Sequence, residues 1–390
     1  MVSGVSEAKK GEPFGYPPGF NILGAKFAGA RLRGARLHRV GMEQVDFSGA
    51  DLVGADLSGS DLSSANLCGA MLEDTDLRGC RLRFAQLEGA ILERADLRGA
   101  DLWGADLSRA VLIGANLRDA QLQEAIFRDA DLTNADLRGA SASMTNLNGC
   151  RLDGADLREI DLHRADMRSA RLSGARLDGV SLADCRLEGI HVADAILERT
   201  RLTRHQIGRV VGEEAGREFD LAARGYLALE RNFSMLGDSE ASRWAYLRRR
   251  RVQKRGQLEA AAAAWGARRP LCAAGAFLSA AADELAELLC NYGESVGRTI
   301  ASLIILAVAF GFVYTITGAA VHVDSSGKTS VSSDPVEIAV FTVSAMVANA
   351  PSGGLQPAGV WVYGLIGVEA LLGVTLTGLL GFVLGNRIRR

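Results

Sequence analysis

Large apolar side chains recur at every fifth position through the first half of the chain. From Ile22 to Ile207 this frame gives 38 consecutive positions, and all but Ala142 carry Leu, Phe, Met, Ile or Val. A small residue, most often Ala, stands two positions before each of them, and Asp, Asn or Arg often stands between. A period of five fits neither a helix nor a strand. The pattern is therefore an internal repeat with one short unit per five residues.

Each unit offers one large apolar side chain, so these side chains must converge on a common axis. Coils that stack at strand spacing advance about 4.8 Å each, so about nine coils give a rod on the order of 45 Å long. Runs such as Ala50-Asp51-Leu52-Val53-Gly54 and Ala95-Asp96-Leu97-Arg98-Gly99 resemble the pentapeptide-repeat family. The resemblance implies a right-handed quadrilateral β-helix over residues 20–207, preceded by an N-terminal extension, 1–19. Such a rod contacts mainly itself, coil against coil.

The charge balance limits what the rod can bind. The chain has 44 Lys and Arg against 46 Asp and Glu, and the two signs also nearly balance within residues 20–207. Some members of the family mimic DNA with an acidic rod, and a balanced surface argues against that role and against a nucleic-acid partner. We expect a spacer or a surface for a protein or ligand partner, with a specific small-molecule site as the alternative.

Cysteine and histidine residues do not form a reactive constellation. Cys80, Cys150 and Cys185 occupy the small position of the repeat on three different sides of the rod, so we expect buried, unpaired thiols. The five histidines are scattered, without metal-ligand spacing. No nucleophile, base or metal set is apparent, so we expect no enzyme activity, no cofactor and no metal.

Residues 208–266 change to helical spacing. We expect one helix from Glu213 to Leu236, a stop at Gly237, and a second helix from Ser239 to Gln257 that is capped by Asp238 or Ser239. This helical hairpin would cover the exposed end of the rod and serve as a connector.

A basic run, Arg248–Arg251 with Lys254 and Arg255, lies in the second of these helices. It fits nucleic-acid contact, a solvated helix face or contact with anionic lipid, and the apolar segments that follow favour the last two. Within the next segment, 267–298, we expect an interfacial amphipathic helix at about 276–290.

Two long apolar stretches predict membrane spans. Residues 299–321 are uncharged, and residues 358–385 are interrupted only by Glu369. Each is long enough to cross a bilayer. Lys328 is the one basic residue between them, so the positive-inside rule places both termini in the cytoplasm of a multi-pass protein of the cell (inner) membrane. The N-terminus lacks the apolar core of a signal peptide, which agrees with a cytoplasmic rod.

The segment between the spans contains a third apolar stretch. Asp334-Pro335-Val336-Glu337 is a helix start, and the helix expected over 335–349 is too short to span. It cannot continue past Pro351, so the turn at 349–354 is irregular. Irregular backbone at membrane depth must be buried in protein or line water, which favours a ring of subunits.

The order span, short helix, turn, Pro357 and second span resembles the two-span pore module of potassium-channel-like proteins. The resemblance implies an all-α pore domain over 299–390, a homotetramer, and an inner helix with Glu369 and a hinge at Gly373. Laid on the family's TVGYG filter, the matching residues are Asn349, Ala350, Pro351, Ser352 and Gly353. Only Gly353 agrees, and potassium selectivity depends on the carbonyl rings of that loop, so the permeant ion stays open.

Two functions remain in competition. The first is an oligomeric ion channel whose partners are its own copies, membrane lipid, a permeant ion and a protein or ligand bound to the rod. The second is a non-conducting, membrane-anchored scaffold, for which the short helix at 335–349 would have no purpose. Glu369 likewise has two interpretations, a functional acid within the membrane or a carboxyl hydrogen-bonded between helices.

Overall fold

The computed structural model of the chain describes residues 21–267, 275, 279–280, 296–323, 328–332, 334–348, 355–358 and 360–388. The chain forms two compact units that divide between Gln253 and Lys254, within helix α4 (Ser239–Gly266). The division therefore falls earlier than the end of the expected connector at residue 266, because the first half of α4 packs with the rod.

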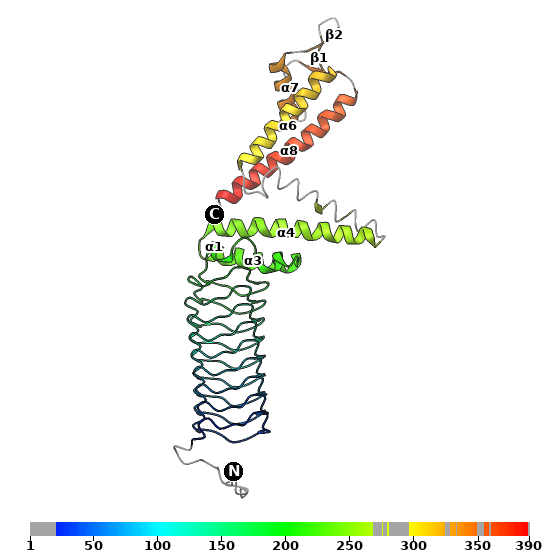
Figure 1. Cartoon of the computed structure of the whole chain (residues 1–390). Coiled ribbons are helices and arrows are strands. Elements are labelled where there is room, and N and C mark those ends of the chain that lie inside the picture. The colour runs from blue at the N-terminus through cyan, green and yellow to red at the C-terminus, as the bar shows by residue number, and fades with distance from the viewer. Residues whose placement is uncertain are drawn as a thin grey trace. The chain divides into compact units, whose positions relative to one another are not determined.

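The first unit is a column of stacked coils (Figure 1). Parallel bridges join residues twenty positions apart, from Asn21 with Gly41 to Ser181 with Arg201. Four five-residue units therefore make one coil, and each unit turns one corner. The apolar centres are buried from Met42 to Leu202, which confirms the repeat frame.

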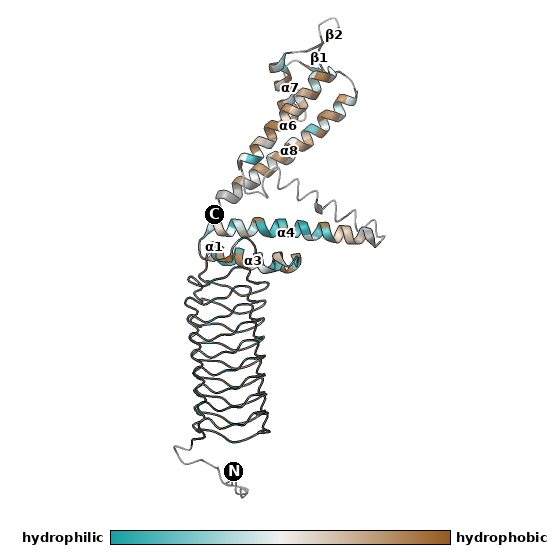
Figure 2. Ribbon diagram, in the orientation of Figure 1, coloured by the Kyte–Doolittle hydropathy of each residue, from teal (hydrophilic) through white to brown (hydrophobic). Residues whose placement is uncertain are grey.

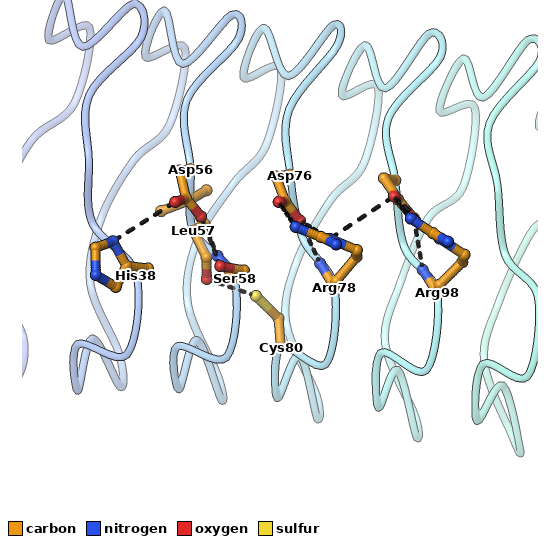
Figure 3. Close-up of polar contacts among 9 residues, drawn as sticks. His38, Asp56, Leu57, Ser58, Asp76, Arg78, Cys80 and Arg98 are labelled. Carbon is orange, nitrogen blue, oxygen red and sulfur yellow. Dashed lines mark hydrogen bonds and ion pairs between the residues drawn. The ribbon is translucent and has the colours of Figure 1, made fainter. Parts of the chain in front are cut away.

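Backbone hydrogen bonds account for four of the five N–H groups in a unit. In the unit 56–60, three N–H groups donate to neighbouring coils and one closes the turn: Asp56 to Ala35 (2.8 Å), Leu57 to Asp76 (2.9 Å), Gly59 to Arg78 (2.8 Å) and Ser60 to Leu57 (3.1 Å). The remaining N–H, that of Ser58, donates to Asp56 Oδ1 at 3.0 Å (Figure 3). Because a buried or half-buried N–H needs a partner, this side-chain turn explains why Asp and Asn recur at the first position.

The fourth residue of a unit takes a left-handed conformation from Gly24 to Arg199, except at Asp184. Gly154 has φ +71°, and a Cβ at this position would collide with Asn134 Oδ1 of the preceding coil. Other units place non-glycine residues there, among them Asn134 itself at φ +58°. Glycine is therefore needed where a polar side chain of the coil below lies across the turn, and is only preferred elsewhere.

Cys80, Cys150 and Cys185, which occupy the small position of the repeat, are buried free thiols, as expected. Cys80 Sγ donates to Leu57 O at 2.8 Å, a contact drawn in Figure 3, and Cys185 Sγ donates to Leu162 O at 3.0 Å. Burial raises the pKa of Cys80 and of Cys185 to about 12. Among the described residues, no group of three or more His, Cys, Asp or Glu could hold a metal ion.

Helices follow the last coil. They are α1 (Arg204–Ile207), α2 (Gly212–Ala215), α3 (Phe219–Met235) and α4. The single helix expected from Glu213 is wrong in its first turns: Glu213 is buried, and its Oε1 accepts the N–H groups of Val192 and Ala193 at 2.7 Å each, so the chain breaks between α2 and α3. Gly237 (φ +76°) ends the α3 turn, and Asp238 Oδ1 caps α4 by accepting the Ala241 N–H at 2.9 Å.

After the second half of α4, the described residues of the second unit form apolar helices and a small sheet. These elements are α6 (Val296–Thr317), β1 (Ala320–Val323), β2 (Thr329–Val331), α7 (Pro335–Ala348), β3 (Gln356–Pro357) and α8 (Val360–Ile388). The sheet is antiparallel in the order β2-β1-β3, so the expected all-α domain is wrong in this respect. Gly318 (φ +61°) ends α6, and the Val-rich segment that follows it pairs as a hairpin.

Two helices of this unit are long and apolar enough to cross a membrane. They are α6, with 22 residues, and the stretch Trp361–Gly381 of α8, with 21. Figure 2 shows apolar residues around both helices, whereas the middle of α4 is polar. Most side chains of the two helices are exposed, for example Ile305 (68%) and Leu371 (69%). Such helices need an apolar environment that the described residues of one chain do not supply. The interfacial helix expected at 276–290 lies largely outside the described residues.

Candidate functional site

Helix α7 is the element around which the second unit is organised. It has 14 residues and is about 21 Å long, whereas the hydrocarbon core of a bilayer is about 30 Å thick. It begins at Pro335, and Asp334 Oδ1 accepts the Val336 N–H at 2.8 Å, as expected for the N-cap. Helix α7 packs against both α6 and α8, which also pack against each other, so a helix too short to span contacts two that can.

Apolar contacts fix α7 in this place. The ring of Phe341 meets Tyr314 of α6 edge to face, with centroids 5.2 Å apart. Both side chains belong to a buried cluster that α6, α7 and α8 share, completed by Ala319, Ala320, Ile338, Ala345, Leu355, Val362 and Ile366. The three helices thus have a common core.

The small sheet joins the two segments that flank α7. β1 follows α6, and β3 precedes α8; they pair through Val321 with Gln356 and Ala320 with Pro357. The Ala358 N–H also donates to Ala319 O at 2.9 Å. The chain that leaves the 349–354 segment is therefore held beside the end of α6.

A polar contact ties β1 to the start of α7. Glu337 Oε2 accepts a hydrogen bond from Ser332 Oγ and lies by His322 Nε2, both at 2.8 Å. These contacts, with Ser332 first, hold the pKa of Glu337 below its usual range. Sequence analysis gave Glu337 only a place in the helix start, because its partner His322 is fifteen residues away and comes close through the hairpin.

Glu369 is fully buried on α8, and the structure gives it a partner. The hydroxyl of Tyr314 on α6 donates to Glu369 Oε2 at 2.5 Å, while Oε1 has no hydrogen-bond partner among the described residues. This geometry favours the second of the two interpretations, a carboxyl hydrogen-bonded between helices. Tyr314 was missed from the sequence, although a hydroxyl within an apolar helix is a signal that a polar partner is needed.

Gly373 is the point where α8 comes closest to the end of α7. A Cβ at this position would lie 2.6 Å from Met346 O and 3.0 Å from Met346 Cβ. Helix α8 runs without a break through Gly373. The glycine thus allows close helix packing, and its assignment as a hinge stays a prediction from the resemblance.

The five residues expected to line the narrow part of a pore lie outside the described residues. They are Asn349, Ala350, Pro351, Ser352 and Gly353. The structure describes the residues on either side, Ala348 at the end of α7 and Leu355 before β3. Of the predicted site residues, the structure describes Glu369 and Gly373.

The surface of the rod carries a ladder of alternating acidic and basic side chains on one side. Asp76 and Arg78 form an ion pair at 2.6 Å, and Arg78 Nε also lies 3.8 Å from Asp96 of the next coil (Figure 3). Equivalent pairs follow at Arg98–Asp96, Arg138–Asp136 and Arg158–Asp156. The hydrogen bond from Arg78 holds the pKa of Asp76 below its usual range. The balanced ladder agrees with the expectation that this rod is not an acidic mimic of DNA.

The repeat matches the model of a known protein family. Eight copies of the pentapeptide-repeat family model match residues 23–59, 55–94, 90–129, 115–154 and 145–184. No curated protein matches the chain.

Several solved structures resemble the rod. HetL from the cyanobacterium Nostoc, a pentapeptide repeat protein involved in the regulation of heterocyst differentiation, is 34% identical over 47% of this chain and 81% of its own, with a TM-score of 0.31. A pentapeptide repeat protein from the thylakoid lumen of Arabidopsis thaliana is 35% identical over 26% of this chain and 71% of its own, with a TM-score of 0.26. QnrB1, a plasmid-mediated fluoroquinolone resistance protein, is 21% identical over 48% and 93%, with a TM-score of 0.29.

Proposed function

The chain belongs to the pentapeptide-repeat family, and we propose that it joins a rod of that family to the pore module of an oligomeric ion channel. The right-handed quadrilateral β-helix that the family builds serves as a cytoplasmic sensing or interaction domain. The helices α6, α7 and α8 form the conducting part.

The position of α7 is the observation that carries this proposal. A simple membrane anchor needs helices that span, such as α6 and α8, and has no use for a shorter apolar helix of 14 residues that packs against both of them. A short helix that ends at membrane depth leaves the next backbone groups without helical partners. Such backbone is tolerated where it is buried in protein or lines a water-filled cavity.

An oligomer follows from the exposed surface of the same helices. One copy leaves large apolar side chains outward on α6 and α8, among them Phe312 (66%) and Tyr363 (62%). Neighbouring copies and lipid would cover these side chains, and a ring of copies would wall the 349–354 turn. We expect a homotetramer, by resemblance to the two-span pore module.

For this channel we expect both termini in the cytoplasm. Arg387 lies in the last turn of α8, Arg389 and Arg390 come after it in the sequence, and Arg298 precedes most of α6. The segment between the spans has only Lys328 as a basic residue. The positive-inside rule then gives a multi-pass protein of the cell membrane with a cytoplasmic rod.

The departure of residues 349–353 from the TVGYG pattern favours a second candidate, the non-conducting scaffold. Pro351 lacks an N–H and restricts the turn, so the ring of carbonyls that selects potassium is not expected. Flux of several monovalent and divalent ions from liposomes containing the full chain separates the two. Conduction of any of them supports the channel, and no flux from a folded oligomer supports the scaffold.

A further inference from the structure

The last coil of the rod has an open edge. In the coil before it, the N–H groups of Leu177 and Gly179 donate to Ile196 O and Glu198 O, both at 2.9 Å. The equivalent groups one coil later belong to Leu197 and Arg199, and within the ranges that the structure describes neither N–H has a partner. Unpaired main-chain donors in strand register are a template for another extended segment.

At two other places on this end, a side chain of the chain supplies a partner. Gln206 Nε2 donates to Leu182 O at 2.5 Å, and Glu213 Oε1 accepts from Val192 and Ala193. The Val192 N–H is a donor that a further coil would have bonded, and the Gln206 amide also donates at 2.9 Å to Cys185 O, a carbonyl that a further coil would have used. The edge at 196–199 has no equivalent side chain placed over it, although α3 lies beside it.

A cleft of about 230 Å³ lies between this edge and α3. One wall is residues 194–198, which contain Leu197 of this edge and end one residue before Arg199. The other wall is one face of α3, since its residues recur at helical spacing: Arg224, Leu227, Ala228, Arg231, Asn232 and Met235. The cleft is smaller than the roughly 300–1,000 Å³ of sites for drug-sized ligands, so a peptide bound there would seat only part of its length in it and would extend beyond its mouth.

The floor of the cleft contains an unsatisfied amide. Asn232 is buried, and its Nδ2 donates to Thr200 O at 2.9 Å. Only the NH₂ group can donate to a carbonyl, so this bond fixes the orientation of the amide. Its Oδ1 is then an acceptor without a partner among the described residues. Asn232 Oδ1 therefore lacks a hydrogen-bond donor, and the Leu197 and Arg199 N–H groups lack acceptors.

The two walls leave apolar surface exposed at the mouth of the cleft. Ile196 is 41% exposed on the coil, and Met235 is 56% exposed on α3. An ion pair between Arg224 and Asp194, at 2.8 Å, joins the two walls and fixes their separation.

We propose that this cleft binds an extended peptide segment of a partner protein, which adds one strand-like unit to the last coil. Its main-chain carbonyls accept from the Leu197 and Arg199 N–H groups, whose two-residue spacing matches the period of a strand. Alternate apolar side chains of the peptide contact Ile196 and Met235. The main-chain hydrogen bonds would supply affinity, and the side-chain contacts would determine which peptide sequences bind, as in other cases of strand addition.

The test uses the full chain in lipid nanodiscs and the capped peptide Ac-Thr-Val-Thr-Val-Thr-NH₂ as the probe. Hydrogen exchange of the segment 194–200 is followed with increasing peptide. We expect saturable slowing of the Leu197 and Arg199 amides by about tenfold or more, because bound amides exchange only when the complex opens. Unchanged exchange at saturating millimolar peptide would overturn the proposal.

A matched pair of variants locates the site. Met235→Lys places a charge at the mouth of the cleft, whereas Met144→Lys makes the same change at a methionine that is 51% exposed on the rod. We expect the slowing to disappear in Met235→Lys and to persist in Met144→Lys. The same slowing in both variants, or its loss in both, would contradict binding in this cleft. The peptide Ac-Thr-Asp-Thr-Asp-Thr-NH₂ should bind wild type at least about tenfold more weakly, because it loses the apolar contacts; equal binding would also count against the proposal.

Discussion

Tyr314 and Glu369 join the two long apolar helices through a single buried hydrogen bond of 2.5 Å. Their residues are fifty-five positions apart, and the bond crosses the core that α7 also shares. A buried carboxyl with no partner is costly, so this bond stabilises one packing of α6 against α8. It also makes Glu369 a structural part of the helix bundle.

Tyr314→Phe should therefore weaken the helix bundle. The change removes the donor and leaves both oxygens of Glu369 unpartnered, for which we expect a loss of about 1–3 kcal/mol. Thermal unfolding of the full chain in detergent measures it. Tyr363→Phe is the matched control, because Tyr363 is 62% exposed on α8 and should change the midpoint little. Equal midpoints for Tyr314→Phe and wild type would show that the bond contributes nothing.

At the first position of each unit, the hydrogen bond that the Asp side chain accepts should matter more for stability than the charge of the carboxylate. Asp106 Oδ1 accepts the Ser108 N–H at 2.9 Å. Asp106→Asn keeps an acceptor there, whereas Asp106→Ala leaves the N–H without one, for which we expect a loss of about 0.5–1.5 kcal/mol. Urea unfolding followed by circular dichroism ranks the three proteins. If Asp106→Asn lowers the free energy of unfolding as much as Asp106→Ala does, the charge of the carboxylate stabilises the unit and the hydrogen bond does not.

The ionic ladder should make the rod sensitive to acid. Arg78 lowers the pKa of Asp76, so the folded state holds this carboxylate ionised below the unfolded pKa of about 3.9. The stabilisation is fully present above that value and is lost as the pH falls through the lower folded pKa. The stability difference between wild type and Asp76→Asn should thus be largest near about pH 6 and shrink by about pH 3. Chemical unfolding at both values checks this, and a difference that grows toward acid would refute it.

The buried thiols should be inert. Because burial raises the pKa of Cys80 and Cys185, almost none of either is thiolate near about pH 8, the form that alkylating reagents attack. Cys68 is only partly buried and serves as the internal comparison. Peptide mass spectrometry after iodoacetamide treatment of the folded protein should find Cys68 modified before Cys80, Cys150 or Cys185. Rapid labelling of those three would mean that the rod opens or that the thiols have another role.

The rod could be predicted closely because each of its contacts is local to the repeat. The five-residue spacing of apolar side chains such as Leu52 and Leu57 specifies which residues form the core. The small residue two positions before each leaves room for that side chain. The C-terminal end of the rod departs from this rule. The break between α2 and α3 depends on Glu213 reaching back twenty residues to Ala193, and no periodic pattern encodes such a contact.

The second unit was predictable in its apolar segments and their order, but not in its polar contacts. Hydropathy locates α6 and α8, and Asp334 with Pro335 locates the start of α7. The hairpin of β1 and β2 was missed because its seven strand residues carry only a weak alternation. The partners of Glu369 and Glu337 arise from tertiary packing, which sequence spacing does not specify.

The most direct test of the channel is single-channel recording of the full chain and of Asn349→Ala in planar bilayers under matched ionic conditions. Residues 349–353 line the narrow part in this account, so wild type should conduct and Asn349→Ala should change the permeability ratios while its assembled mass stays the same. Arg164→Gln, an exposed change on the rod, should leave the ratios as in wild type. Permeability ratios that are identical in wild type and Asn349→Ala, or an assembled wild-type protein without current at any voltage and in any lipid tried, would contradict a pore at this turn.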